Sequence, residues 1–167
     1  TGFSVGSGFV PTLVGKEDAV ISDALNHGCM IDGIRLTKAD RRVYAHNDIH
    51  ELEAHLRDTK QARRRLVLTD GVFSMDGDIA PLDAICELCE QYDAMLYVDD
   101  AHGEGVMGEG GRGIVDHFSL QGRVDFEAGT FSKAFGVVGG LVAGAEEVRL
   151  HALNHSRTWL LSASHPP

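Results

Sequence analysis

The sequence predicts an α/β fold built on a largely parallel sheet. Short runs rich in β-branched and aromatic residues alternate with amphipathic stretches along most of the 167 residues. This alternation is typical of parallel strands joined by crossover helices. No internal repeat, low-complexity tract or linker interrupts the pattern. The length and a hydrophobic content of 43% suit one domain with a buried core.

The expected elements follow from composition and periodicity. Six runs are predicted to be strands, at 19–22, 43–46, 66–69, 95–98, 125–130 and 141–143. Three stretches space their apolar residues as helices do, at 49–57, 81–92 and 146–154. We expect Asn47 or Asp48 to cap the first helix, and Pro81 to occupy the first turn of the second.

Charge and cysteine content exclude several classes of protein. The 25 acidic and 15 basic residues give a formal charge of −10, which argues against a nucleic-acid partner.

No segment approaches the roughly 18 apolar residues of a membrane span, and the first residues do not resemble a signal peptide. We expect no membrane partner and a cytoplasmic location. Cys86 and Cys89 form a C-x-x-C pair, but their helical spacing favours packing in the core over a metal or redox role.

Acidic and basic side chains follow the predicted strand 95–98. Asp99, Asp100 and His102 come directly after it, and parallel α/β sheets bind ligands beyond the carboxyl ends of their strands. Metal binding by Asp99 and His102 lacks an evident third ligand. A metal-dependent hydrolase built on all three residues nevertheless remains an alternative. The other use is a carboxylate that faces a heteroaromatic nitrogen, with the imidazole bonded to the same ring.

Lys133 lies between a predicted strand and a glycine-rich stretch that ends at Gly140. Glycines allow a ligand to approach the backbone, and nearby hydroxyls can hold a phosphate. The residue order matches neither a P-loop nor a dinucleotide fingerprint. A shielded lysine is a competent nucleophile toward a carbonyl carbon. With Asp99 and His102, it supplies what a pyridoxal 5'-phosphate (PLP) site needs: an amine and a carboxylate that keeps the pyridinium protonated.

Six segments, in this order, resemble the α-oxoamine synthase family of fold-type I PLP enzymes. They are 22–27, 45–48, 69–77, 98–105, 110–113 and 130–136. The resemblance implies a three-layer sandwich with a mostly parallel sheet. It also implies that residues 1–167 are the central part of the large PLP-binding domain, without an N-terminal arm and a C-terminal small domain.

The resemblance implies a role for each catalytic residue. Lys133 would bond covalently to the cofactor and later take the α-proton of the substrate. Asp99 would partner the pyridine nitrogen, His102 would donate to the phenolic oxygen of the ring, and His27 would stack on the ring face. Without the resemblance, His27 would be a hydrogen-bonded loop histidine.

Further residues are implied to bind the cofactor. Ser74 would lie near the phenolic oxygen, while Thr130 and the backbone amides of Gly2 and Phe3, at a helix start, would hold the phosphate. The family forms homodimers with shared sites, so Ser162 or Ser164 is expected to reach the phosphate of the neighbouring subunit. Asp70 and Asp78 are interpreted only as turn and loop formers.

The implied reaction condenses an amino acid with an acyl-CoA. The stretches 122–125 and 132–140 look closest to glycine C-acetyltransferases, which favours glycine and acetyl-CoA. The alternative is the 8-amino-7-oxononanoate synthase reaction, in which alanine and pimeloyl-CoA condense with decarboxylation. A hypothesis of another class is a catalytically silent folded fragment, because the family's small domain carries the arginine that grips the substrate carboxylate.

Overall fold

A six-stranded sheet with the strand order β2-β1-β3-β4-β5-β6 forms the centre of the molecule. The computed structural model describes residues 1–163. The strands are β1 (Ala19–Asp23), β2 (Asp40–Tyr44), β3 (Arg65–Asp70), β4 (Met95–Asp99), β5 (Phe126–Thr130) and β6 (Gly140–Gly144). All neighbours are parallel except β5 and β6, which are antiparallel. The predicted α/β class with a mostly parallel sheet is confirmed.

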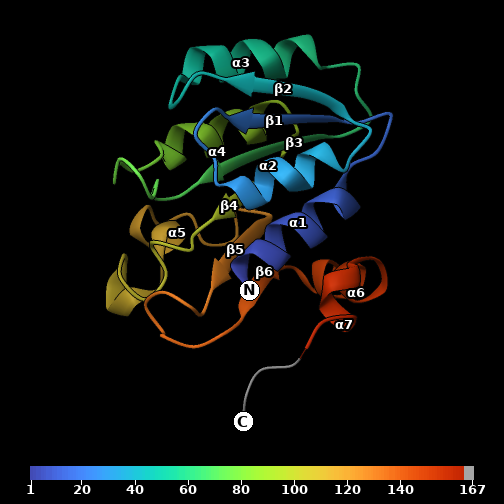
Figure 1. Cartoon of the computed structure of the whole chain (residues 1–167). Coiled ribbons are helices and arrows are strands. Elements are labelled where there is room, and N and C mark those ends of the chain that lie inside the picture. Colours follow the sequence, from blue (N-terminus) through green and yellow to red (C-terminus); the bar gives the residue numbers. More distant parts are fainter. Residues whose placement is uncertain (164–167) are drawn as a thin grey trace.

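Helices cover both faces of this sheet (Figure 1). One face packs against α3 (Ile49–Asp58), α4 (Leu82–Gln91) and α5 (Ile114–His117). The other packs against α1 (Gly2–Leu13), α2 (Gly28–Arg35) and α6 (Glu146–His155). A short 3-10 turn, η1 (Glu109–Gly111), and α7 (Arg157–Leu160) complete the described elements. No described helix is long and apolar enough to cross a bilayer.

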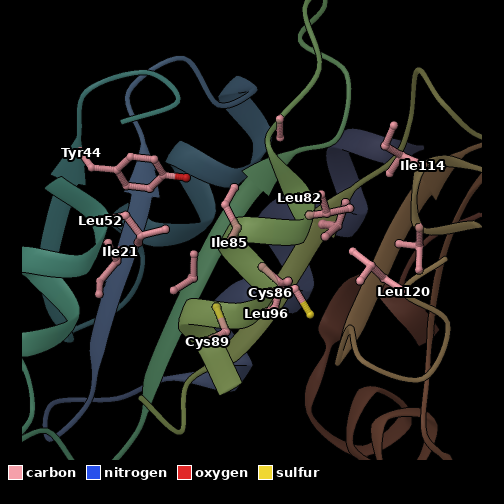
Figure 2. Close-up of a cluster of buried hydrophobic side chains, with 14 of the residues drawn as sticks. Ile21, Tyr44, Leu52, Leu82, Ile85, Cys86, Cys89, Leu96, Ile114 and Leu120 are labelled. Atoms are coloured by element: carbon pink, nitrogen blue, oxygen red, sulfur yellow. The ribbon is translucent and has the colours of Figure 1, made fainter. Parts of the chain in front are cut away.

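Alternating side chains of the strands divide the core into two clusters. Figure 2 shows the cluster under α3 and α4, which receives Ile21, Val67, Leu96 and Val98 from the sheet. The opposite cluster receives Val20, Leu66, Leu68 and Tyr97. Cys86 and Cys89 are buried within the first cluster, which confirms the predicted packing role of the C-x-x-C pair. Because the period of a strand is two, Asp70 and Asp99 continue the face that packs against α1 and α2.

Helix α2 was not predicted, and its glycines explain why. A Cβ atom on Gly33 would lie 2.6 Å from the carbonyl oxygen of Gly6 in α1, and one on Gly6 would lie 2.6 Å from the Sγ of Cys29. The two helices therefore approach each other at a distance that only glycine permits. Glycine costs about 1 kcal/mol relative to alanine inside a helix, so the segment has a weak helical signal although tertiary packing stabilises it.

The predicted strand 43–46 is wrong in position. Strand β2 spans Asp40–Tyr44, because pairing with β1 sets its register and aligns Ala19 with Asp40. The early residues of this edge strand are polar and largely exposed, so hydrophobicity alone does not locate its start. Asp48 is the N-cap of α3 and accepts a hydrogen bond from the Glu51 amide.

Asn26 joins the carboxyl ends of β1 and β3. Its Nδ2 donates to the Oγ of Ser22 at 2.9 Å and to the carbonyl oxygen of Leu68 at 2.8 Å. Its Oδ1 accepts from the amide of Asp70 at 2.8 Å. The side chain is buried, so water cannot replace these partners. This connection fixes the position of the next residue, His27, at the edge of the sheet.

We expect Asn26→Ala to lower the free energy of unfolding by about 1 to 3 kcal/mol, because it leaves buried backbone groups without partners. Urea denaturation of the purified chain measures this effect. Asn154→Ala is the matched control, since the Nδ2 of this exposed residue bonds only within its own helix, and we expect a change within about 0.5 kcal/mol. Equal losses in the two variants would contradict the role assigned to Asn26.

Asp100 points to the face opposite Asp99 and holds the segment that starts α5. Its Oδ2 accepts a hydrogen bond from the amide of Ile114 at 2.8 Å. Burial raises the pKa of this carboxyl from its ordinary value of 3.8 to about 7, although the bond from Ile114 opposes the shift. Between these two values the folded chain keeps a proton that the unfolded chain has released, so stability falls as the pH rises.

The Asp100→Asn variant removes this titration. We expect the free energy of unfolding of the native chain to decline, relative to the variant, as the pH rises from about 4 to about 7. Urea unfolding at several pH values measures this slope. The exposed Asp76 gives the control variant Asp76→Asn, which we expect to keep the native pH dependence. A constant difference between the native chain and Asp100→Asn across this range would refute the assignment.

Candidate active site

A pocket of about 230 Å³ opens at the carboxyl ends of β3, β4 and β5. Of the residues predicted to act in catalysis or to bind the cofactor within one subunit, all except Ser74 line it. The lining consists of Thr1, Gly2, Phe3, His27, Cys29, Asp70, Val72, Asp99, Ala101, His102, Thr130, Ser132 and Lys133. These residues come from segments far apart in the sequence, and the parallel strands bring them to one edge.

One end of the pocket suits an anion. Gly2 and Phe3 line it from the first turn of α1, and an α-helix has no internal acceptors for its first amides. A Cβ on Gly2 would lie 2.9 Å from the Cβ of Thr130, so the helix start and the end of β5 are in close contact. The hydroxyls of Thr130 and Ser132 lie 2.8 Å apart beside it. Amides, hydroxyls and the positive end of a helix dipole together favour a phosphate group.

Two carboxyl groups, those of Asp70 and Asp99, lie side by side in the middle of the pocket. The two residues are paired directly across β3 and β4. Asp99 Oδ1 accepts from the Ala101 amide at 3.1 Å. Burial, followed by the charge of Asp99, raises the pKa of Asp70 to about 8, so Asp70 keeps its proton at neutral pH. The interpretation of Asp70 as a mere turn former was wrong, because the alternation along β3 places it on the pocket face.

His27 and Cys29 lie beside Asp99 at the start of α2. The Nδ1 of His27, the N-cap, accepts from the Cys29 amide at 3.2 Å and lies 3.0 Å from the Cys29 Sγ. That sulfur lies 3.7 Å from Asp99 Oδ2. Burial and the charges of Asp99 and Asp70 raise the pKa of the Cys29 thiol to about 12. The sequence analysis did not single out Cys29, because only the contact between α1 and α2 places it in the pocket.

The edge of Phe3 faces His27, with the two ring centroids 6.5 Å apart and the planes at 77°. On the other side, His102 follows β4 and Lys133 lies on the exposed segment between β5 and β6. Burial and then the positive charge of Lys133 lower the pKa of His102, so its imidazole is neutral at pH 7 and can both donate and accept a hydrogen bond.

Glu104 binds the end of β5, beside the part of the pocket that suits an anion. The sequence analysis did not predict this role. Its Oε1 accepts a hydrogen bond from the backbone amide of Thr130. Burial raises the pKa of this carboxyl, and the bond from Thr130 partly opposes the shift. Glu104 therefore connects the segment that carries His102 to the end of β5. Its sequence signal was weak, since it is one acid among 25 acidic residues.

The remaining predicted residues lie elsewhere. Ser74 is exposed in the segment between β3 and α4 and does not line the pocket. Asp78, interpreted as a loop former, accepts from His46 Nε2 at 2.6 Å and so helps to hold that segment. The Oγ of Ser162 donates to the carbonyl oxygen of Thr158. Ser164 lies outside the described residues.

The ligand set of the metal-hydrolase hypothesis is not assembled in the part of the chain that the structure describes. Successive residues of a strand point to opposite faces, so Asp100 bonds to Ile114 while Asp99 faces the pocket. Within residues 1–163, the group with metal-ligand spacing is instead His27, Cys29 and Asp99, whose ligand atoms all lie within 4.8 Å of one another.

Comparisons with known proteins agree with this geometry. The family model of aminotransferase class I and II matches residues 1–167. The 8-amino-7-oxononanoate synthase of Exiguobacterium sibiricum is 58% identical over 167 residues, which are 100% of this chain and 43% of the relative. The chain thus spans less than half the length of this curated relative.

Solved structures show the same relationship. Serine palmitoyltransferase from S. paucimobilis, with a bound PLP-myriocin aldimine, superposes with a TM-score of 0.94 at 36% identity, over 100% of this chain and 42% of that one. The 8-amino-7-oxononanoate synthase from Francisella tularensis gives a TM-score of 0.83 at 30% identity, over 98% and 47%. The chain therefore belongs to the aminotransferase class I and II family, within the α-oxoamine synthases.

Proposed function

We propose that the pocket binds PLP and that Lys133 forms the covalent bond to its aldehyde carbon. The observation that carries this proposal is the placement of three chemistries in one cavity: the amine of Lys133, the carboxylate of Asp99 and the anion site at the start of α1. Their chemistry fits the cofactor, because PLP has an aldehyde, a ring nitrogen and a phosphate. The PLP-containing structure of the related serine palmitoyltransferase supports the choice of this cofactor.

Each pocket residue then has a role that follows from its surroundings. The carboxylate of Asp99 would hold a proton on the ring nitrogen. Asp70 is neutral near pH 7 because burial raises its pKa to about 8, so it adds no second charge beside Asp99. The imidazole of His27 covers one face of the ring. His102, also neutral, donates to the phenolic oxygen, while Thr130, Gly2 and Phe3 bind the phosphate.

Lys133 has a second role as the base that takes the α-proton of the substrate. Its segment between β5 and β6 is exposed, so the free amine would be able to approach the substrate carbon. Bound PLP supplies an electron-withdrawing ring that accepts the electron pair left on that carbon. Ser74 has no pocket contact in this structure. A role near the phenolic oxygen therefore requires its segment to move.

For the substrates, we propose L-alanine and pimeloyl-CoA, condensed with decarboxylation. The names of the relatives support this choice over glycine and acetyl-CoA, which the sequence analysis favoured, because 8-amino-7-oxononanoate synthases reach 58% identity. The short segments that suggested glycine C-acetyltransferase cover few residues. We further propose that residues 1–167 belong to the large PLP-binding domain and that the complete enzyme is a homodimer.

We expect Lys133→Ala to abolish covalent capture of PLP. Borohydride reduction after incubation with PLP, followed by mass spectrometry, should find one cofactor per native chain on the peptide that contains Lys133. The control Lys60→Ala changes an exposed lysine outside the pocket and should leave capture unchanged. Capture that persists in Lys133→Ala would remove the basis of the lysine assignment.

Substrate preference separates the two candidate reactions. With PLP bound, we expect L-alanine to change the visible absorbance at a concentration about tenfold lower than glycine, since one methyl group in a fitted pocket is worth a factor of about ten or more. Release of the CoA thiol should also be faster with pimeloyl-CoA than with acetyl-CoA. The opposite order would restore glycine and acetyl-CoA. Absorbance changes without thiol release would support the hypothesis of a silent fragment.

A further inference from the structure

Cys29 brings to the pocket a thiol for which the proposed PLP chemistry has no use. Its side chain is 1% exposed, yet its sulfur lines the cavity. The thiol lies between two other potential ligands, 3.0 Å from His27 Nδ1 and 3.7 Å from Asp99 Oδ2. A sulfur, an imidazole nitrogen and a carboxylate oxygen are the three ligand types that zinc prefers.

The spacing of these atoms is close to that of a zinc site. Zn–S and Zn–N bonds of about 2.3 and 2.0 Å at the tetrahedral angle place sulfur and nitrogen about 3.5 Å apart. The observed sulfur–nitrogen separation is 3.0 Å, the sulfur–oxygen separation is 3.7 Å, and all three ligand atoms lie within 4.8 Å of one another. Movements of these side chains would therefore give an ion three of its four ligands, and the open cavity leaves the fourth position to water.

We propose that His27, Cys29 and Asp99 form a binding site for a thiophilic divalent cation, with zinc as its representative, in the chain that lacks PLP. The ion takes the place of the thiol hydrogen between Sγ and Nδ1. The Cys29 S–H bond breaks, the proton passes to solvent, and a metal–sulfur bond forms without a change in oxidation state. The thiolate and the Asp99 carboxylate then balance both charges of the cation.

One feature of the pocket favours such an ion and one opposes it. Asp70 adjoins Asp99 across the strand pair, and a cation bound there would favour the ionised form of both carboxyl groups. The opposing feature is the cap bond from the Cys29 amide to His27 Nδ1, 3.2 Å long, because an ion on Nδ1 displaces it. The chain then loses one hydrogen bond at the start of α2, while the ion gains three protein ligands.

This inference rests in one part on the proposed function. Asp99 and His27 are the residues that we assign to the ring nitrogen and the ring face of PLP. An ion held by the same two side chains therefore excludes the cofactor. Zinc binding itself does not depend on that assignment, because the three ligands belong to the chain alone. The cation would act as an inhibitor that competes with cofactor loading.

Equilibrium dialysis of the PLP-free chain against zinc sulfate tests the site. We expect the native chain to bind one zinc ion that Cys29→Ala loses, with an affinity at least about tenfold lower in the variant. Cys89→Ala is the matched control, since Cys89 is also buried but lies in the opposite core cluster, and it should bind zinc as the native chain does. Cys29→Ser, which keeps the side-chain shape, should also bind more weakly.

Cobalt(II) gives an independent readout, because a thiolate ligand produces a charge-transfer absorption in the near ultraviolet. The native chain and Cys89→Ala should show this band, and Cys29→Ala should not. Equal zinc affinity in the native chain and Cys29→Ala, or a cobalt complex without a thiolate band, would overturn the proposal.

Competition with the cofactor is measured separately. Zinc-loaded native chain, freed of excess metal by dialysis, should take up PLP more slowly than metal-free chain, while zinc treatment should not slow uptake by Cys29→Ala. If the metal-free chain takes up no PLP at all, the proposed function fails and the zinc site stands on the dialysis result. If zinc binds and PLP uptake is unaffected, the overlap of the two sites is refuted.

Discussion

Parallel pairing of β3, β4 and β5 is the constraint on which the active site depends. In this register Asp70 lies opposite Asp99, and Asp99 lies opposite Ala128. The carboxyl ends of the three strands thus lie at one edge of the sheet. Because side chains alternate between the two faces of a strand, the functional ones lie on the face covered by α1 and α2. A slip of one residue in β4 would turn Asp99 into the core and bring Asp100 into the pocket.

Electrostatic balance in the pocket follows from this placement. Two acids that are adjacent and largely removed from water cannot both ionise at low cost, and the more deeply buried one, Asp70, keeps its proton. His102 is held neutral by burial and by the charge of Lys133. The pocket also holds the carboxylate of Asp99, which suits a cationic ring, and the amine of Lys133, which suits an aldehyde. The same negative charge at Asp99 attracts a cation when no ring is present.

The contact between α1 and α2 completes the site on the face of the sheet that these two helices cover. Close packing through Gly6 and Gly33 brings the first turn of α1 to the edge where β5 ends. It also holds the start of α2, where His27 and Cys29 lie against Asp99. Asn26 fixes the same segment to β1 and β3 from below. The phosphate-binding amides and the ring-facing histidine therefore depend on helix packing as much as on the strands.

The sequence by itself determined the α/β class, five strands to within one residue at each end, and the candidates Lys133, Asp99 and His102, because hydrophobic period and strand-end chemistry are local properties. The family resemblance added His27. Tertiary structure alone decided the start of β2, the existence of α2, and the roles of Asp70, Cys29 and Glu104. These depend on which distant segments meet. An edge strand takes its register from its neighbour, a glycine-rich helix is stabilised by the helix beside it, and the pKa of a carboxyl depends on burial, which no short motif encodes.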